Sequence, residues 1–238
     1  MRLVDDVVGD LESDRLSREG ELRLIRRLAE ESSTEGERAM LRRSLVLLTY
    51  SHLEGFCRFA ISTYVSTLNS LSLSCEAASA AVAAAGMSDV FKALRDTNHK
   101  HALFKKSLLD DRVVHMAARE QIFVEQNRLF FSQPVNIPDA LIETHYSLST
   151  DVIKKLMFQV GLKTDDVESR RGAIEKLKHI RNLIAHGDRL KVPSDEDATS
   201  FVDTAREVMT FLQREITAAL THETYKKPVE SEEAALPA

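Results

Sequence analysis

The segment from about residue 37 to residue 69 constrains the fold more than any other part of the chain. Its apolar residues fall on more than one face of an ideal helix: Leu45, Val46, Leu47, Leu48, Tyr50, Leu53, Phe56, Phe59, Ala60, Tyr64 and Leu68. A helix that is apolar on several faces must be covered on several sides. We therefore expect this segment to be the central helix of a bundle, with Ser33 or Thr34 as its N-terminal cap.

The scarcity of turn-forming residues predicts an all-α fold for the whole chain. Only 8 glycines and 5 prolines occur in 238 residues, and helix-forming residues are abundant. Helical periodicity predicts two short helices near residues 3–11 and 22–28 and a helix that ends at Gly161. Further helices are expected over about residues 167–186 and, after Ser194, to about residue 222.

Residues 70–148 have a weaker pattern, and we expect them to form a variable helical insertion in the bundle. Short helices are predicted at 74–85, 88–95 and 115–130, with loops near residues 98–101 and 132–138. Residues 1–222 would then form a single domain. The acidic segment 223–238 contains two prolines and little to bury, so we expect it to be disordered.

Composition excludes several classes of protein. The net charge of −5 argues against coating of nucleic acid by bulk electrostatics, although a local basic site is compatible with it. Cys57 and Cys75 lack metal-ligand spacing and indicate buried thiols in a reducing, cytoplasmic setting. No signal peptide and no run of ~20 apolar residues is present, so we expect no membrane span. The pair His99 and His101 has no neighbouring ligand cluster, and neither a metal ion nor a cofactor is expected.

The segment 178–187 concentrates the chemically useful side chains. Asn182 and His186 are four residues apart and share one face of an ideal helix, so the amide is expected to contact the imidazole. Arg181 lies about 140° away from His186 around the helix at ~100° per residue, and its long side chain can curl toward the same surface. Gly187 stands where a C-terminal cap is expected.

These residue types suit metal-independent cleavage of RNA, whose 2′-hydroxyl can act as the nucleophile. Arg181 can hold phosphate oxygens through two hydrogen bonds. His186 can transfer protons, and the C-terminal end of a helix stabilises a protonated imidazole. The segment supplies one histidine from its motif, so a second copy related by two-fold symmetry would complete the site.

Local charge is consistent with an anionic substrate. Between residues 154 and 191 ten basic residues (154, 155, 163, 170, 171, 176, 178, 181, 189 and 191) face five acidic ones (165, 166, 168, 175 and 188). Lys178, Arg189 and Lys191 are the candidates for substrate binding. A simpler interpretation also fits: an ordinary helix end, capped by Gly187, with a solvated basic face.

Two segments resemble one known family. Arg181-Asn182-Leu183-Ile184-Ala185-His186-Gly187 is similar to the Arg-X4-His motif of the HEPN superfamily. The segment Tyr50-Ser51-His52-Leu53-Glu54-Gly55-Phe56 resembles the first core helix of its MAE-like branch. The likeness extends over roughly residues 20–220. It implies a dimeric bundle with a four-helix core and a metal-independent endoribonuclease site in which Arg181 and His186 are catalytic and Asn182 is supporting.

The resemblance also implies a biological setting, that of a toxin or antiphage effector with an antitoxin or defence-system partner. In HEPN toxins that are silenced by a nucleotidyltransferase, the motif continues as His-X-Tyr, whereas here His186 is followed by Gly187 and Asp188. That mode of regulation is therefore not expected. The alternatives are a non-catalytic HEPN-like module that binds RNA or nucleotide, or assembles a complex, and a helical scaffold without a nucleic-acid role.

Glu54 is the remaining candidate for the site. A carboxylate in an apolar stretch is costly unless it is paired. If the two helices pack together, Glu54 could accept hydrogen bonds from Arg181 or His186. The alternatives are a structural ion pair and an exposed position, and Tyr50 is assigned to the core.

Overall fold

The computed structural model describes residues 4–98, 100–108, 110–142, 147–188 and 191–228, and it confirms the all-α prediction. In chain order the helices are α1 (Val4–Glu31), α2 (Glu35–Ser70), α3 (Ala80–Gly86), α4 (Ser88–Arg95), α5 (Arg112–Ser132), α6 (Thr150–Gln159), α7 (Asp165–Glu168), α8 (Arg171–Ala185) and α9 (Asp195–Thr221). A short 3-10 helix (Asp139–Leu141) precedes α6. Within these residues, no helix is long and apolar enough to cross a membrane.

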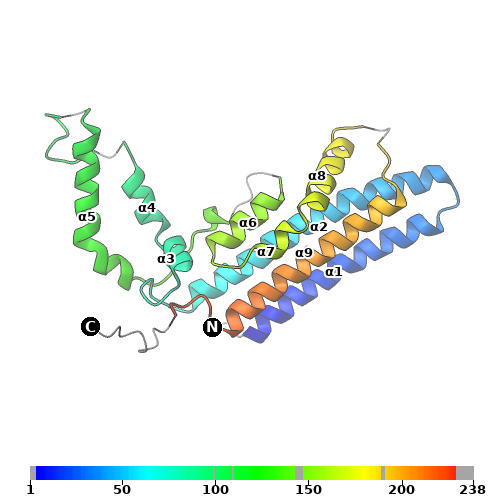
Figure 1. Ribbon diagram of the computed structural model, residues 1–238, viewed down its shortest axis with the longest axis horizontal. Coiled ribbons are helices and arrows are strands. Elements are labelled where there is room, and N and C mark those ends of the chain that lie inside the picture. Colours follow the sequence, from blue (N-terminus) through cyan, green and yellow to red (C-terminus); the bar gives the residue numbers. More distant parts are fainter. Residues whose placement is uncertain (1–3, 99, 109, 143–146, 189–190, 229–238) are drawn as a thin grey trace, which may run out of the picture.

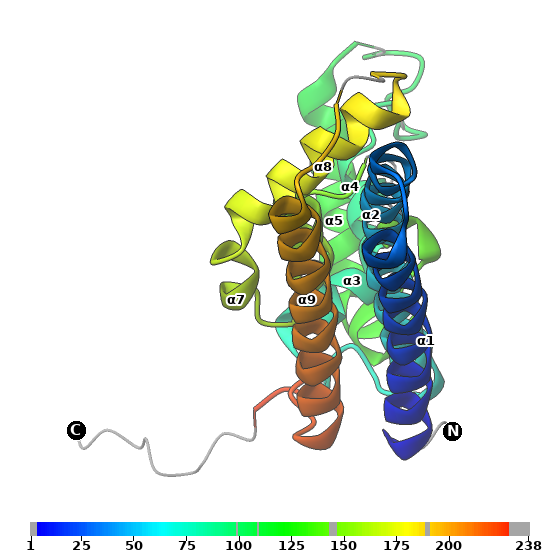
Figure 2. The same ribbon diagram turned by 90° about the vertical axis from the view of Figure 1, so that its right-hand side faces the viewer.

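Helix α2 is the centre of the bundle, as its apolar pattern predicts. It contacts α1 and α9, which run beside it along the long axis of the molecule, and α8, which crosses over it (Figures 1 and 2). Thr34 caps α2 through a capping box with Glu37. Leu53, Phe56 and Tyr64 are at most 1% exposed, because neighbouring helices cover α2 on several sides. Helices α1, α2, α8 and α9 form the four-helix core.

Helix α1 differs from the prediction, because the two short helices expected there form one continuous helix of 28 residues. The polar stretch between its two apolar patches stays helical with the help of ion pairs four residues apart. Arg18 Nε lies 2.6 Å from Asp14 Oδ2, and Arg15 Nη1 lies 2.5 Å from Glu19 Oε1. Arg15 Nε also donates to Gln213 Oε1 of α9 at 2.7 Å. The polar stretch is therefore part of a helix–helix contact.

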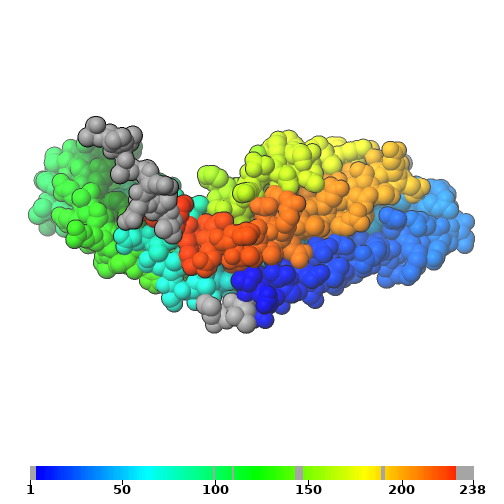
Figure 3. Space-filling model, turned by 60° about the horizontal axis from the view of Figure 1, so that its bottom comes forward, coloured from blue at the N-terminus to red at the C-terminus, as the bar shows by residue number. Residues whose placement is uncertain are grey.

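Helices α3, α4 and α5 form an arm that stands off from the bundle, with α5 farthest from α8 (Figures 1 and 3). Partly buried aromatic rings of α4 and α5 pack on one another and against the main hydrophobic core. The ring centroids of Phe91 and Phe123 are 6.3 Å apart, and those of Phe123 and Phe130 are 5.8 Å apart. The expected loops at residues 98–101 and 132–138 carry no α-helix, apart from Ser132, the last residue of α5, among the residues that the structure describes.

The expectation of disorder from residue 223 onward is wrong for residues 223–228. Tyr225 is 6% exposed, and its carbonyl accepts a hydrogen bond from the Ser79 amide at 2.7 Å. The Lys227 amide donates to the Ala77 carbonyl at 2.8 Å. This segment therefore ties the end of α9 to the start of the arm. Residues 229–238, also part of that expectation, lie outside the described residues.

Phe56 tests the central position of α2. Because its side chain is 0% exposed, Phe56→Ala leaves a cavity and is expected to lower the free energy of unfolding by about 3–5 kcal/mol. Phe158→Ala is the matched control: Phe158 is 74% exposed, and its loss should change stability by less than ~0.5 kcal/mol. Urea unfolding of both variants measures the difference, and equal effects would contradict the described core.

Candidate functional site

The C-terminus of α8 ends in the capping motif that Gly187 predicts. Gly187 has a φ of +91°, and its amide donates to the Ile184 carbonyl at 3.1 Å. The Asp188 amide donates to the Leu183 carbonyl at 3.0 Å. These two bonds make a Schellman motif, which satisfies carbonyls that the helix end would otherwise leave unpaired. The motif places His186 at the cap position, with its side chain exposed.

Arg181 lies at the contact of α8 with α2, next to the predicted Glu54. Its Nη2 atom is 3.8 Å from Glu54 Oε2, and the two side chains are 27% and 26% exposed. Its Nη1 atom donates to Asn182 Oδ1 at 2.8 Å. The guanidinium carbon lies 3.9 Å from the centroid of the Tyr50 ring. The structure therefore brings together Arg181, Asn182 and Glu54 of the predicted site, and it adds Tyr50.

Tyr50 is the site residue that sequence reasoning assigned only to the core. It is indeed 1% exposed, but its ring forms the surface on which the guanidinium rests, a cation–π contact. Burial, and then the charge of Glu54, raise the pKa of the Tyr50 phenol. The hydroxyl therefore stays protonated near neutral pH and donates to the Leu148 carbonyl at 3.1 Å. Its spacing of four residues from Glu54 was the available signal, because such residues share one helix face.

Close packing against α1 explains why the residue after Glu54 is a glycine. A Cβ atom at Gly55 would lie 2.6 Å from Nη1 of Arg18, so the guanidinium of α1 occupies the space of a side chain. Glu54 meets α8, and Phe56 is 0% exposed in the core. Glu54, Gly55 and Phe56 thus contact α8, α1 and the buried core, respectively.

His186 is not joined to the arginine in a single chain. Among the described residues, no hydrogen bond or ion pair connects its imidazole to Arg181, Asn182 or Glu54. The predicted hydrogen bond between the Asn182 amide and His186 is not formed, and the amide oxygen accepts from Arg181 Nη1. Arg181 reaches toward α2, whereas His186 is exposed to solvent.

Two of the three candidates for substrate binding lie within the described residues, and their surroundings differ. Lys178 Nζ lies 4.0 Å from Glu175 Oε2, so its charge is partly balanced. Lys191 is half-buried, and its amide donates to Asp188 Oδ1 at 3.1 Å. Arg189 lies outside the described residues.

The count of local basic charge overstates the charge available to a ligand. Many basic side chains of this region form ion pairs with carboxylates of α2, α6, α7, α8 or α9 in the folded protein, and these are Lys154, Arg170, Arg171, Lys176, Lys178 and Arg181. Exposed pairs of this kind contribute little to stability. They do reduce the net positive potential that a phosphate would meet.

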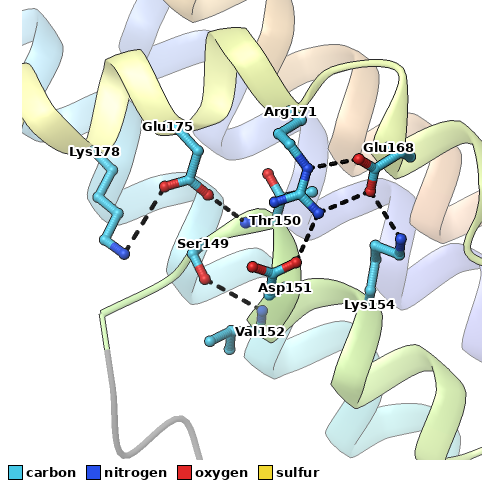
Figure 4. A network of polar contacts seen from close by, with 9 residues as sticks. All are labelled: Ser149, Thr150, Asp151, Val152, Lys154, Glu168, Arg171, Glu175 and Lys178. Atoms are coloured by element: carbon cyan, nitrogen blue, oxygen red, sulfur yellow. Dashed lines mark hydrogen bonds and ion pairs between the residues drawn. The ribbon is translucent and has the colours of Figure 1, made fainter.

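A polar network holds the first half of α8 against α6 and α7 (Figure 4). Arg171 donates to Glu168 Oε1 at 2.6 Å and to Asp151 Oδ1 at 2.7 Å. Glu175 accepts from the Thr150 amide at 3.0 Å, at the N-terminus of α6. Hydrogen bonds from Arg171 first, and then from Lys154, lower the pKa of Glu168 to about 2. The network fixes the orientation in which α8 presents its C-terminal half.

The two cysteines are buried and are not available to a ligand at this site. Cys57 and Cys75 are free, buried thiols, as predicted, and burial raises the pKa of Cys57 to about 12. In the described part of the chain, no group of three or more His, Cys, Asp or Glu side chains is placed to hold a metal ion.

Comparison with known proteins gives one match. The family model described as HEPN_MAE_28990-like HEPN matches residues 8–225. This range includes both the Glu-Gly-Phe segment of α2 and the Arg-X4-His segment at the end of α8. None of the curated proteins and none of the solved structures matches the chain.

The cap of α8 can be tested by Gly187→Ala. The left-handed φ of +91° at Gly187 is unfavourable for any residue with a Cβ atom, so the variant should lose about 1–2 kcal/mol of stability. Gly9→Ala is the matched control: it lies within α1 with no atom near its added Cβ and should gain about 0.5–1 kcal/mol. Thermal unfolding followed by circular dichroism measures both. Stabilisation of both variants would rule out the capping geometry.

The network at Glu168 predicts a dependence of stability on pH. The pKa of Glu168 is about 2 in the folded protein and close to its ordinary, higher value in the unfolded chain. Its contribution is therefore present above the ordinary carboxyl pKa and is lost as pH falls toward the folded value. Glu168→Gln should be less stable than wild type at pH 7, and the difference in stability should shrink as pH falls from the ordinary carboxyl pKa and become small near pH 2. Melting temperatures across this range provide the measurement, and a difference that persists at low pH would contradict the assignment.

Proposed function

The chain belongs to the HEPN_MAE_28990-like HEPN family, and from this premise we propose that it is a metal-independent endoribonuclease. HEPN domains are generally of ribonuclease type, often dimerise and bind RNA. The observation that carries the proposal is the position of Arg181, which is held by Tyr50, Asn182 and Glu54 on the same helix that ends in the exposed His186. The proposed site lies between two copies of the chain.

Arg181 would stabilise the negative charge that develops on the phosphorane. Its guanidinium has five N–H donors, and Nη1 uses one of them on Asn182. The contact with Glu54, at 3.8 Å, is longer than a hydrogen bond, so Nη2 can turn to phosphate without loss of a strong bond. Tyr50 holds the plane of the guanidinium. A donor oriented in advance loses little entropy when the substrate binds.

His186 would transfer a proton in the same step. RNA supplies the nucleophile, since its 2′-oxygen can attack the adjacent phosphorus after losing a proton. The products would be a 2′,3′-cyclic phosphate and a 5′-hydroxyl. An exposed imidazole at a helix end is accessible to a strand that crosses the surface, and general acid–base catalysis of this type contributes about 10²–10⁴-fold.

The resemblance to HEPN effectors extends the proposal to biology. We place the protein among toxins or antiphage effectors whose activity is controlled by an antitoxin or another defence-system protein.

A second function is favoured by one specific observation. In a single chain Arg181 contacts Tyr50 and Glu54 of α2 whereas His186 is exposed, and much of the local basic charge is paired with carboxylates. A non-catalytic module that binds RNA or assembles a complex would have this arrangement too. It predicts salt-sensitive binding of RNA without cleavage.

The experiment that separates the two is cleavage of total cellular RNA by the purified protein in excess EDTA. Wild type is expected to give discrete products, and Arg181→Ala and His186→Ala should each lower the rate by at least ~100-fold while they remain folded. Lys92→Ala changes an exposed side chain of α4, in the arm, and serves as the control with unchanged activity. Equal cleavage by all variants would overturn the assignment of the site. Binding without cleavage by wild type would establish the second function.

A further inference from the structure

Cleavage by 2′-hydroxyl attack needs two proton transfers, and the motif supplies one imidazole. One group must accept the proton of the 2′-hydroxyl while another donates a proton to the departing 5′-oxygen. The second group belongs to the same site, so its assignment rests on the proposed function.

Most other described histidines are engaged elsewhere. His52 Nε2 lies 3.2 Å from Glu21 Oε2, between α2 and α1. His115 is 2% exposed in the arm, and its Nδ1 atom accepts from the His101 amide at 3.1 Å. His222 caps the far end of α9. His99 and His145 lie outside the described residues.

His179 is placed differently, because it shares an exposed stripe of α8 with His186. Both histidines are exposed, and Asn182, half-buried, lies between them. Seven residues are close to two turns, so the two imidazoles leave the helix on nearly the same side, ~10 Å apart along its axis. The opposite side of α8, with Ile180 and Ile184 at 5% and 6% exposure, packs on the bundle. The stripe is therefore open to a second molecule.

Within one chain this spacing is too long for a single phosphate, because both reacting oxygens are bonded to the same phosphorus. A two-fold axis removes the difficulty. If two α8 helices face each other in antiparallel orientation about the point between Asn182 and Leu183, each His186 stands opposite the partner's His179, because the two histidines are equally far from that point. We propose that His186 of one copy and the partner's His179 flank the same scissile phosphate.

The step balances within this pair. His179 accepts the proton of the 2′-hydroxyl, the O2′–P bond forms and the P–O5′ bond breaks. His186 donates its proton to O5′, so one proton is taken up and one is released. We assign the acid to His186, at the C-terminal cap of α8, and the base to His179, inside the helix.

Subunit complementation tests the arrangement. His179→Ala and His186→Ala homodimers should each lose at least ~100-fold in rate. A heterodimer of the two, purified with two affinity tags, contains one site with both histidines and one with neither. It should regain about half of the wild-type rate, as two-fold symmetry requires. His222→Ala is the control histidine and should keep full activity. Full activity of His179→Ala, or an inactive heterodimer, would overturn the proposal while the proposed function stands.

A binding measurement gives an answer even if the purified protein does not cleave. The probe is a 2′-O-methyl RNA strand, whose blocked 2′-oxygens cannot attack phosphorus, and the readout is the NMR signals of the imidazole protons. The signals of His179 and His186 should both shift on addition of the strand, and that of His222 should not. A shift of His186 alone overturns the role of His179. The absence of both cleavage and shifts would overturn the proposed function as well.

Discussion

The burial of α2 on several sides is the constraint on which the rest of the molecule depends. Its apolar faces require α1, α9 and α8 as neighbours, and this requirement makes the four-helix core. Helix α8 crosses one of these faces. The α2 residues at the crossing therefore determine how the side chains in the C-terminal half of α8 are oriented. Tyr50 and Glu54 lie at that crossing, and they position Arg181 through a cation–π contact and an ion pair.

The contacts of Arg181 with Tyr50 and Glu54 orient its side chain but add little to the stability of the fold. An ion pair of 3.8 Å between side chains about a quarter exposed is a weak contributor to folding. The stack on Tyr50 fixes the plane of the guanidinium and leaves its edge for a ligand. The stronger polar contacts of α8 lie at its other end, where Arg171 and Glu175 tie it to α7 and α6 (Figure 4). The N-terminal half of α8 is thus held by strong polar contacts, whereas its C-terminal half carries the exposed His179 and His186.

Features set by neighbouring residues could be predicted from the sequence, and features set by distant residues could not. The start of α2, for which Ser33 or Thr34 was the expected cap, and the helix end at Gly187 depend on a few consecutive residues, so their patterns were sufficient. The structure selects Thr34. The continuity of α1 depends in part on Gln213 of α9, and the order of residues 223–228 depends on Tyr225 meeting residues 77–79. Asn182 was paired with the wrong neighbour because helix spacing alone cannot weigh His186 against Arg181.

The most direct test of the central claim is the removal of a single oxygen atom, the 2′-oxygen, from the substrate. An RNA with several mapped cleavage positions is compared with the same strand carrying a 2′-deoxy sugar on the 5′ side of one of these positions, in excess EDTA. If the 2′-oxygen is the nucleophile, the substituted strand stays intact at that position while other positions are still cut. Cleavage of the deoxy position at the normal rate would mean that water or another nucleophile attacks the phosphorus, and the chemistry assigned to Arg181 and His186 would be wrong.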